Sequence, residues 1–201
     1  MIIPNILHCS SEGIYYIHDY VPVRAFSYSS EEEVTFSREL WDYKKGEEQA
    51  INKYTNEIMR AIAQLSGYIP DKKIGLVAVP PSKVNKESSI CTSIWNIENW
   101  YNQGITETVF NCDKQIYDYR MLLTRIVDVK TSHESRVRAT YEEQIASIAC
   151  SRDRLWRYRT AFIILDDVTT LGTSMNACRD ILIKNGADED YIYRLAIAKT
   201  K

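Results

Sequence analysis

The sequence predicts an α/β domain built on a doubly wound, mostly parallel sheet. Short apolar runs of strand length alternate along the chain with stretches whose apolar residues recur at helical spacing. The clearest runs of strand type are residues 74–79, 161–165 and 191–198. Because parallel strands are joined by crossover helices, this alternation favours a sheet that helices cover on both faces.

The N-terminal quarter is expected to contain two short strands and the start of the helical region. Residues 13–28 mix Ile, Tyr and Val with turn residues, which indicates two strands and a turn. Ser30 followed by Glu33 is a capping-box pattern, so a helix should begin there and end near Gly46. Residues 47–66 then carry apolar side chains at helical spacing, which predicts a second helix.

The middle of the chain continues the alternation. The strand at 74–79 stops at Pro80-Pro81, because proline cannot continue a central strand. A polar loop follows, and a helix is expected at 90–101 and a strand at 106–110.

The C-terminal part is expected to hold two more helices and the last strand. Residues 122–129 fit neither pattern clearly, whereas the apolar residues within 137–148 predict an amphipathic helix. After the strand at 161–165, a helix is expected at 175–185, with Gly186 at the position where a left-handed cap is common. Residues 191–198 are the last predicted strand.

Length and composition limit the classes of protein to consider. A chain of 201 residues suits one domain, and 45% hydrophobic residues suffice for a core. A formal net charge of −2 argues against a dedicated nucleic-acid surface, so nucleic acid is not expected as a direct ligand. No apolar run reaches membrane-spanning length, so no membrane partner is expected.

The cysteines and the N-terminus favour a cytoplasmic location. The first residues lack the charged and apolar regions of a signal peptide. The five cysteines are scattered and never spaced C-x-x-C, which predicts reduced thiols and no zinc site. They are Cys9, Cys91, Cys112, Cys150 and Cys178.

The stretch from 161 to 174 carries the chemistry. Five apolar residues run into Asp166 and Asp167, where the strand is expected to end, and a hydroxyl-rich loop with one glycine leads into the helix. Backbone N–H groups of such a loop favour an anion, and adjacent carboxylates can accept hydrogen bonds from hydroxyls attached to that anion. A sugar 5-phosphate with free 2- and 3-hydroxyls fits both halves. The alternative is a buried strand followed by a capped helix, with both aspartates solvated.

This stretch resembles the phosphoribosyl-pyrophosphate (PRPP) signature of type I phosphoribosyltransferases. In that family a hydrophobic strand runs into two acidic residues and then into a Thr/Gly/Thr-rich loop for the 5-phosphate. The matching residues here are Ile163-Ile164-Leu165-Asp166-Asp167, followed by Thr170-Leu171-Gly172-Thr173-Ser174. Leu171 occupies a position that is often Thr or Ala, a mild departure because backbone amides hold most of the phosphate.

Other features are similar to the ComF-like branch of this family. Tyr43-Lys44-Lys45-Gly46 stands where the branch has a Lys-x-x-Gly-like element, and residues 77–83 match its strand with a Val-Pro segment and a basic loop. A polar, Arg-containing segment at 131–138 and the end of the chain shortly after one more strand also agree. The zinc-ribbon cysteines of the branch are absent, and residues 83–89 replace its Arg-Gly-Phe-Asn-Gln-like segment. The resemblance runs from Val21 to the C-terminus and is sharp only in the signature.

The resemblance implies a fold and an activity. The fold would be of the type I phosphoribosyltransferase kind, with residues 1–45 as a small N-terminal hood and 46–201 as the core domain. The protein would be a glycosyltransferase of nucleotide metabolism that moves ribose 5-phosphate from PRPP to a nitrogenous base or related acceptor and releases pyrophosphate. Mg²⁺ would be the cofactor.

The resemblance also implies roles for individual residues. Asp166 and Asp167 would bind the ribose hydroxyls and hold Mg²⁺ directly or through water. The loop residues that would bind PRPP are Thr169, Thr170, Leu171, Gly172, Thr173 and Ser174. The residues of the pyrophosphate loop would be Pro80, Pro81, Ser82 and Lys83, with Lys83 its cation and, with the two aspartates, a catalytic residue. Further candidates are His133, Arg136 and Arg138. For each basic residue the alternative is a solvated surface charge, and for the histidine a structural role.

Several functions stay open at this point. Thr170 stands where purine-salvage members usually place an aspartate base, so a 6-oxopurine acceptor is disfavoured. The first hypothesis is an enzyme acting on PRPP and an unidentified base-like acceptor. The second is a catalytically silent PRPP or nucleotide sensor, or a subunit of a DNA-uptake or defence system. A receiver-like domain ranks lowest, because receivers place their acidic pair near the N-terminus. A homodimer and membership of a larger complex are both compatible with the sequence.

Overall fold

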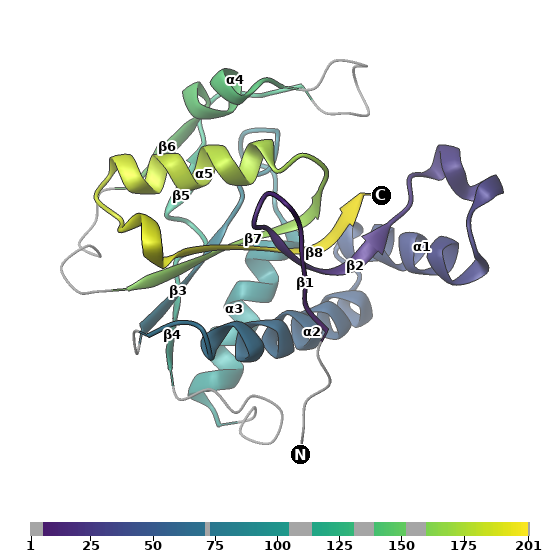
Figure 1. Cartoon of the computed structure of the whole chain (residues 1–201), viewed down its shortest axis with the longest axis horizontal. Helices are drawn as coiled ribbons and strands as arrows, with labels where there is room; N and C mark the ends of the chain where they lie inside the picture. Colours follow the sequence, from purple (N-terminus) through teal and green to yellow (C-terminus); the bar gives the residue numbers. More distant parts are fainter. Residues whose placement is uncertain (1–5, 71–72, 105–113, 131–138, 152–159, 201) are drawn as a thin grey trace.

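A six-stranded sheet forms the central layer of the molecule in the computed structural model (Figure 1). The structure describes residues 6–70, 73–104, 114–130, 139–151 and 160–200. The strand order is β1-β2-β8-β7-β3-β4, in which β1 is antiparallel to β2 and all other neighbours are parallel. The bounds are β1 His8–Cys9, β2 Tyr15–Tyr20, β3 Lys73–Ala78, β4 Gln115–Asp118, β7 Ala161–Thr169 and β8 Ile192–Thr200. A separate antiparallel pair consists of β5, Leu123–Arg125, and β6, Ile148–Cys150.

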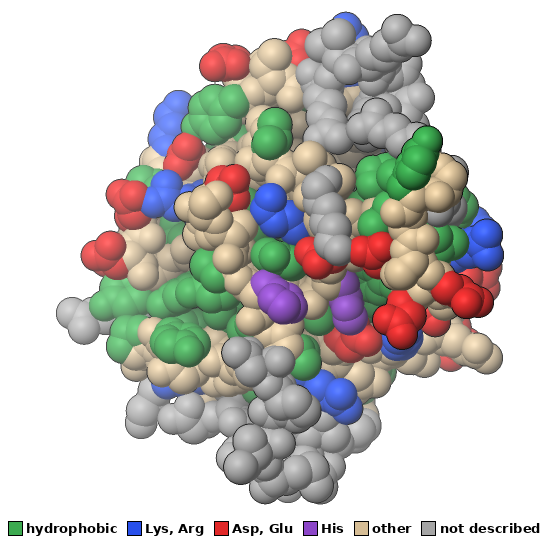
Figure 2. Space-filling model, turned by 45° about the vertical axis from the view of Figure 1, so that its right-hand side comes forward, with side chains coloured by type: hydrophobic (Ala, Val, Ile, Leu, Met, Phe, Trp, Pro, Cys, Tyr) green, Lys and Arg blue, Asp and Glu red, His purple; other side chains and the backbone are tan. Residues whose placement is uncertain are grey.

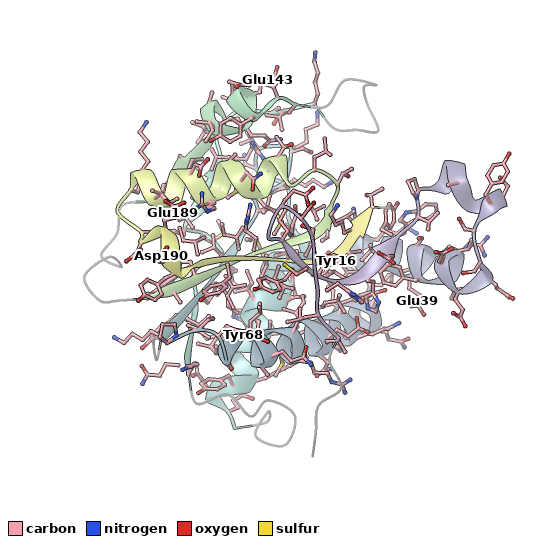
Figure 3. The ribbon with its side chains drawn as sticks, viewed as in Figure 1. Tyr16, Glu39, Tyr68, Glu143, Glu189 and Asp190 are labelled. Carbon is pink, nitrogen blue, oxygen red and sulfur yellow. The ribbon has the colours of Figure 1, made fainter. Side chains whose placement is uncertain are left out.

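Helices cover both faces of the sheet (Figure 1). On one face lie α2, Glu48–Ser66, and α3, Ser89–Asn102, and on the other lie α4, Tyr141–Ala146, and α5, Thr173–Lys184. The described residues also include the 3-10 helices η1, Val23–Tyr28, and η3, Glu189–Tyr191. The remaining helix, α1 at Glu31–Lys45, lies beyond the end of the sheet at which β8 finishes. Figure 3 shows this arrangement through its labels, since Glu39 of α1 is at that end and Glu189 and Asp190, which precede β8, are at the other.

The core is divided by the sheet into two apolar layers. Alternate residues of a strand face opposite sides, so Leu76 and Ile163 pack with α2 and α3, while Val77 and Ile164 pack with α5. All four side chains are fully buried. The predicted α/β class and the mostly parallel sheet covered on both faces are therefore confirmed.

The structure gives no support to a separate hood at residues 1–45. Within the described part of this segment, β2 is a member of the main sheet beside β8. Ile17 of β2 and Leu40 of α1 are buried in the same apolar layer as α2. The segment belongs to the same core because its apolar residues complete the sheet and cover α2.

Two helix signals near the N-terminus are confirmed. The hydroxyl of Ser30 accepts a hydrogen bond from the Glu33 amide, and the Glu33 carboxylate accepts one from the Ser30 amide, which completes the capping box. Gly46 ends α1 in the left-handed conformation, at φ 88°. The second strand expected within 13–28 is wrong, since residues 23–28 form a 3-10 helix.

Other element predictions need correction where short segments are concerned. The helix expected across 137–148 is only α4, because the chain turns at Ser147 and Ile148 enters β6 to pair with Arg125. The strand β4 was not expected, and its one buried apolar residue, Ile116, gives little sequence signal. The strand expected at 106–110 lies outside the described residues.

Two bulk properties complete the description. Among the described helices, none is both long enough and apolar enough to cross a membrane. The four described cysteines, Cys9, Cys91, Cys150 and Cys178, are all free thiols.

Candidate functional site

The acidic pair, Asp166 and Asp167, lies on the part of β7 where the pairing with β3 has ended and the pairing with β8 continues. The pairing with β3 reaches Leu165, opposite Ala78, and is closed by a hydrogen bond of 2.9 Å from the Val79 amide to the Leu165 carbonyl. The pairing with β8 continues to Thr169, opposite Lys199. The prediction that the strand ends before the carboxylates is therefore wrong on the β8 side. On the β3 side no described strand pairs with β7 beyond Leu165, because the chain turns away at Pro80-Pro81.

Local hydrogen bonds orient the two carboxylates. Asp166 Oδ1 accepts from the Asp167 amide at 2.9 Å, and Asp167 Oδ1 accepts from the Val168 amide at 2.5 Å. Within the described residues, the Oδ2 atom of neither aspartate has a hydrogen-bond partner. These two oxygens are the acceptors that the pair can offer to a ligand.

A lysine from the N-terminal part of the chain contacts this pair. The Lys44 ammonium lies 3.3 Å from Asp167 Oδ1, and the two side chains are 36% and 32% exposed. Burial raises the pKa of the Asp166 carboxyl well above its ordinary value, the charge of Asp167 raises it further, and Lys44 opposes the shift. Burial would lower the pKa of Lys44, but the carboxylates of Asp167 and Asp166 outweigh it and leave that pKa above its ordinary value.

The position of Lys44 follows from how α1 ends. Tyr43, the preceding residue, is fully buried, and its hydroxyl lies 3.0 Å from Ser93 Oγ. The Ser89 hydroxyl donates to the Tyr43 carbonyl at 2.5 Å, so α3 holds the last turn of α1. Gly46 then ends the helix with φ 88°. In the sequence, Lys44 is part of the element Tyr43 to Gly46, but no role could be assigned to it, because only the fold brings it to Asp167.

The loop after β7 presents backbone amides at the start of α5. Gly172 is the N-cap, with φ 72°, and no side chain caps the helix. In the described ranges, the N–H groups of Gly172, Thr173 and Ser174 have no acceptor, whereas the Asn176 amide donates to the Gly172 carbonyl at 2.8 Å. Unpaired N–H groups at a helix N-terminus favour an anion.

Glycine is required at position 172 for two reasons. Its φ lies in the left-handed region, and a Cβ there would stand 2.3 Å from Ile14 Cδ1. Ile14 itself is fully buried, so it cannot move aside freely. The turn before β2 therefore packs directly under the loop and supports its shape.

The other predicted loop residues differ in accessibility. Leu171 is 69% exposed, whereas Thr169 is 4% exposed and belongs to the strand. Thr170 Oγ1 lies 3.2 Å from Thr200 Oγ1, and the Thr170 carbonyl accepts from Lys199 Nζ at 3.3 Å. The end of β8 thus anchors the start of the loop and leaves Leu171 to Ser174 as its outer part.

A buried arginine holds the loop that follows β3. Arg125, at 7% exposure, donates from Nε to the Pro81 carbonyl at 2.8 Å and from Nη2 to the Pro80 carbonyl at 3.1 Å. It also donates to Ser147 Oγ at 2.5 Å and to Gln144 Oε1 at 3.1 Å. Burial lowers its pKa from the ordinary value. Sequence reasoning missed this residue, although a single charge inside the apolar run 121–127 is a signal that could have found it.

The rest of that loop is fixed by the segment after β5. The Val129 amide donates to the Ser82 carbonyl at 2.8 Å, and the Val84 amide donates to Asp128 Oδ1 at 2.7 Å. The Lys83 ammonium lies 4.0 Å from Asp128 Oδ2. Among the described residues, the cation in contact with the acidic pair is therefore Lys44 and not Lys83. The three remaining candidates, His133, Arg136 and Arg138, lie outside the described residues.

The carboxylate oxygens of Asp166 and Asp167 suit a divalent cation that the protein holds weakly. Within the described ranges, no three His, Cys, Asp or Glu side chains gather as a metal cage. Mg²⁺ prefers oxygen ligands and usually keeps several waters, with one or two carboxylates and substrate phosphates completing its shell. Asp166 and Asp167 match the protein share of such a shell.

No family model matches the chain, and no curated protein is detectably similar to it.

Proposed function

We propose that this protein binds PRPP with Mg²⁺ at the carboxyl end of β7 and transfers its ribose 5-phosphate to a nitrogenous acceptor. The observation that carries the proposal is the position of Asp166 and Asp167 beside an edge that β3 leaves uncovered, immediately before a loop with unpaired amides at Gly172, Thr173 and Ser174. Carboxylates that can accept hydrogen bonds from sugar hydroxyls thus lie next to amides that can bind a phosphate. A sugar phosphate requires both kinds of group.

The two halves would bind opposite parts of the sugar. The amides of the loop and the N-terminus of α5 would hold the 5-phosphate, aided by the hydroxyls of Thr173 and Ser174. The free Oδ2 atoms of Asp166 and Asp167 would accept hydrogen bonds from the 2- and 3-hydroxyls. This arrangement orients carbon 1 for attack, and such positioning accounts for much of the rate in a group transfer.

The leaving group would lie toward the loop after β3. The hydrogen bond from Val79 to Leu165 places the start of that loop beside β7, and Arg125 fixes the Pro80 and Pro81 carbonyls. Bound Mg²⁺ would supply positive charge that stabilises the departing pyrophosphate, with Asp166 and Asp167 as its protein ligands, directly or through water. Lys83 is the first of the two lysines that this loop carries, and Lys86 is the second.

The reaction balances without an added oxidant or reductant. The bond from carbon 1 to the pyrophosphate oxygen breaks, and pyrophosphate keeps the electron pair. A bond from carbon 1 to the acceptor nitrogen forms, and the proton that the acceptor nitrogen loses is taken up by the departing pyrophosphate. Thr170, whose hydroxyl lies 3.2 Å from that of Thr200, is no base, so the acceptor should be one that does not need a carboxylate there.

Calorimetric titration with PRPP and Mg²⁺ tests the proposal. Asp166→Asn with Asp167→Asn should weaken binding by about 2–4 kcal/mol, because the hydrogen bonds that the two carboxyl groups make to the sugar are lost. Asp42→Asn with Asp190→Asn is the matched control, because it changes two carboxyl groups to amides at exposed positions and should leave binding unchanged. Absence of binding at millimolar PRPP would refute the proposal.

Pyrophosphate release with a panel of nitrogenous bases separates the enzyme from a sensor. Release that depends on one base would identify the acceptor. PRPP binding with no release for any base would favour the second candidate, a catalytically silent PRPP-binding protein or a subunit of a larger system.

A further inference from the structure

The contact between Lys44 and Asp167 joins two distant parts of the chain at one point. Lys44 is in the last turn of α1, and Asp167 is near the end of β7, with 3.3 Å between Nζ and Oδ1. An exposure of 36% for Lys44 and 32% for Asp167 means that a ligand can reach both groups. The contact is thus part of the accessible surface at the acidic pair and not of the core.

The next residue shows that this placement is specific. Lys45 contacts Asp42 at 3.5 Å within α1, and these side chains are 67% and 54% exposed. Lys45 therefore makes an ordinary surface pair, which contributes little. Lys44 is aimed at the end of β7 because Tyr43 is anchored in the core between α1 and α3.

Lys44 supplies a positive charge beside acidic side chains, where an anionic ligand would need one. In Figure 2, which turns this side of the molecule toward the viewer, acidic side chains gather on the right-hand half. The carboxylates that act on Lys44 itself are those of Asp167 and Asp166. A ligand with several phosphates would be repelled by such a surface unless a local cation met its charge.

We propose that Lys44 recognises the 1-diphosphate of PRPP and makes the site discriminate against a sugar phosphate with a free 1-hydroxyl. This role rests on the proposed function. If Asp166 and Asp167 accept the 2- and 3-hydroxyls, carbon 1 adjoins carbon 2, so a cation in contact with the pair also adjoins the substituent on carbon 1. The ammonium would exchange part of its contact with Asp167 for the diphosphate oxygens, and the ribose hydroxyls would replace it on the carboxylate.

Titration of two ligands into three proteins tests this role. PRPP and ribose 5-phosphate, each with Mg²⁺, are titrated into the wild type, Lys44→Gln and the matched control Lys45→Gln. Lys44→Gln should bind PRPP about ten- to a hundredfold more weakly, the effect of one charged hydrogen bond, and bind ribose 5-phosphate within about threefold of the wild type. Lys45→Gln should match the wild type for both ligands. Retained binding of ribose 5-phosphate also shows that Lys44→Gln is folded.

The other outcomes overturn the role in distinguishable ways. Equal losses for both ligands would mean that Lys44 only supports the acidic pair. An unchanged PRPP affinity in Lys44→Gln would mean that the contact with Asp167 is a surface ion pair. In either case the proposed function would stand, because the wild type still binds PRPP. A wild type that binds neither ligand would overturn the proposed function and this role together.

Discussion

The two loops that leave neighbouring strands at the candidate site are held in different ways. The loop after β7 takes its shape from its own Gly172 and from the apolar contact with Ile14, and it leaves amides free. The loop after β3 has its carbonyls bound by Arg125 and by the Val129 amide. The first loop offers donors to a ligand, whereas the second is a fixed wall supported from behind.

This difference shows which of the two loops could be recognised from the sequence. The first loop can be recognised from a run of consecutive residues, Asp166 to Ser174, although Ile14 and the end of β8 also support its shape. The shape of the second depends on a side chain more than forty positions later in the chain, since Arg125 reaches back to Pro80 across 45 positions. The two loops should therefore respond to different substitutions, and the largest effects should come from the support of the second loop.

The largest expected effect is that of Arg125→Ala. The substitution leaves the Pro80 and Pro81 carbonyls and the Gln144 amide without their partner in a buried place, so the free energy of unfolding should fall by about 2–4 kcal/mol. Urea denaturation followed by circular dichroism measures it. Arg60→Ala is the control, because Arg60 lies at an exposed position of α2, and its loss should cost less than about 1 kcal/mol. Equal losses in the two variants would show that Arg125 does not hold the loop.

Next in size is Gly172→Ala, which breaks the first loop. The new Cβ meets Ile14 Cδ1 at 2.3 Å and the backbone is left-handed, so stability should fall by about 1–3 kcal/mol and PRPP affinity by more than about tenfold. Gly186→Ala has a φ of 102° and open space, so it reports backbone strain alone. Because Ile14→Ala removes the clashing atom, the double variant with Gly172→Ala should be more stable than the sum of the single losses predicts. Additive losses would rule out the contact with Ile14 as the cause.

A similar distinction explains which helices and strands could be predicted from the sequence. The helix α2 was predicted because its apolar pattern repeats over 19 residues, and β3 because its apolar residues form a continuous run. The 3-10 helix at 23–28 was predicted wrongly, and β4 and β6 were missed, because short elements without such a pattern are decided by the neighbours they pack against.

The candidate site divides in the same manner. Asp166, Asp167 and Gly172 were recognisable because they follow one another along the chain. Lys44 and Arg125 could not be placed, because their roles depend on contacts with residues far away in sequence. The predicted end of the strand at Leu165 is correct for the pairing with β3 and wrong for the pairing with β8, which continues to Thr169.

A smaller effect should appear in the dependence of stability on pH. The pKa of Asp166 is raised, chiefly by burial and then by Asp167, so the folded protein keeps a proton that the unfolded chain has released. The free energy of unfolding should therefore fall as the pH rises from the ordinary range of a carboxyl toward the raised pKa of Asp166. Urea denaturation at several pH values should show this slope in the wild type and a flatter profile in Asp166→Asn. Identical profiles would mean that Asp166 ionises in the fold as it does in the unfolded chain.

The smallest expected effect on stability is that of Lys83→Gln, and it sharpens the comparison of the two loops. Lys83 and Asp128 are 41% and 57% exposed and 4.0 Å apart, so the change in the free energy of unfolding should be within about 0.5 kcal/mol. If the loop after β3 is a fixed wall that carries one cation for pyrophosphate, the same variant should still lower PRPP affinity by several-fold, with ribose 5-phosphate unaffected. Lys184→Gln, at an exposed position in the last turn of α5, is the control. A loss of stability comparable to that of Arg125→Ala would show that Lys83 supports the loop, and Lys44 would then be the cation left to meet the diphosphate.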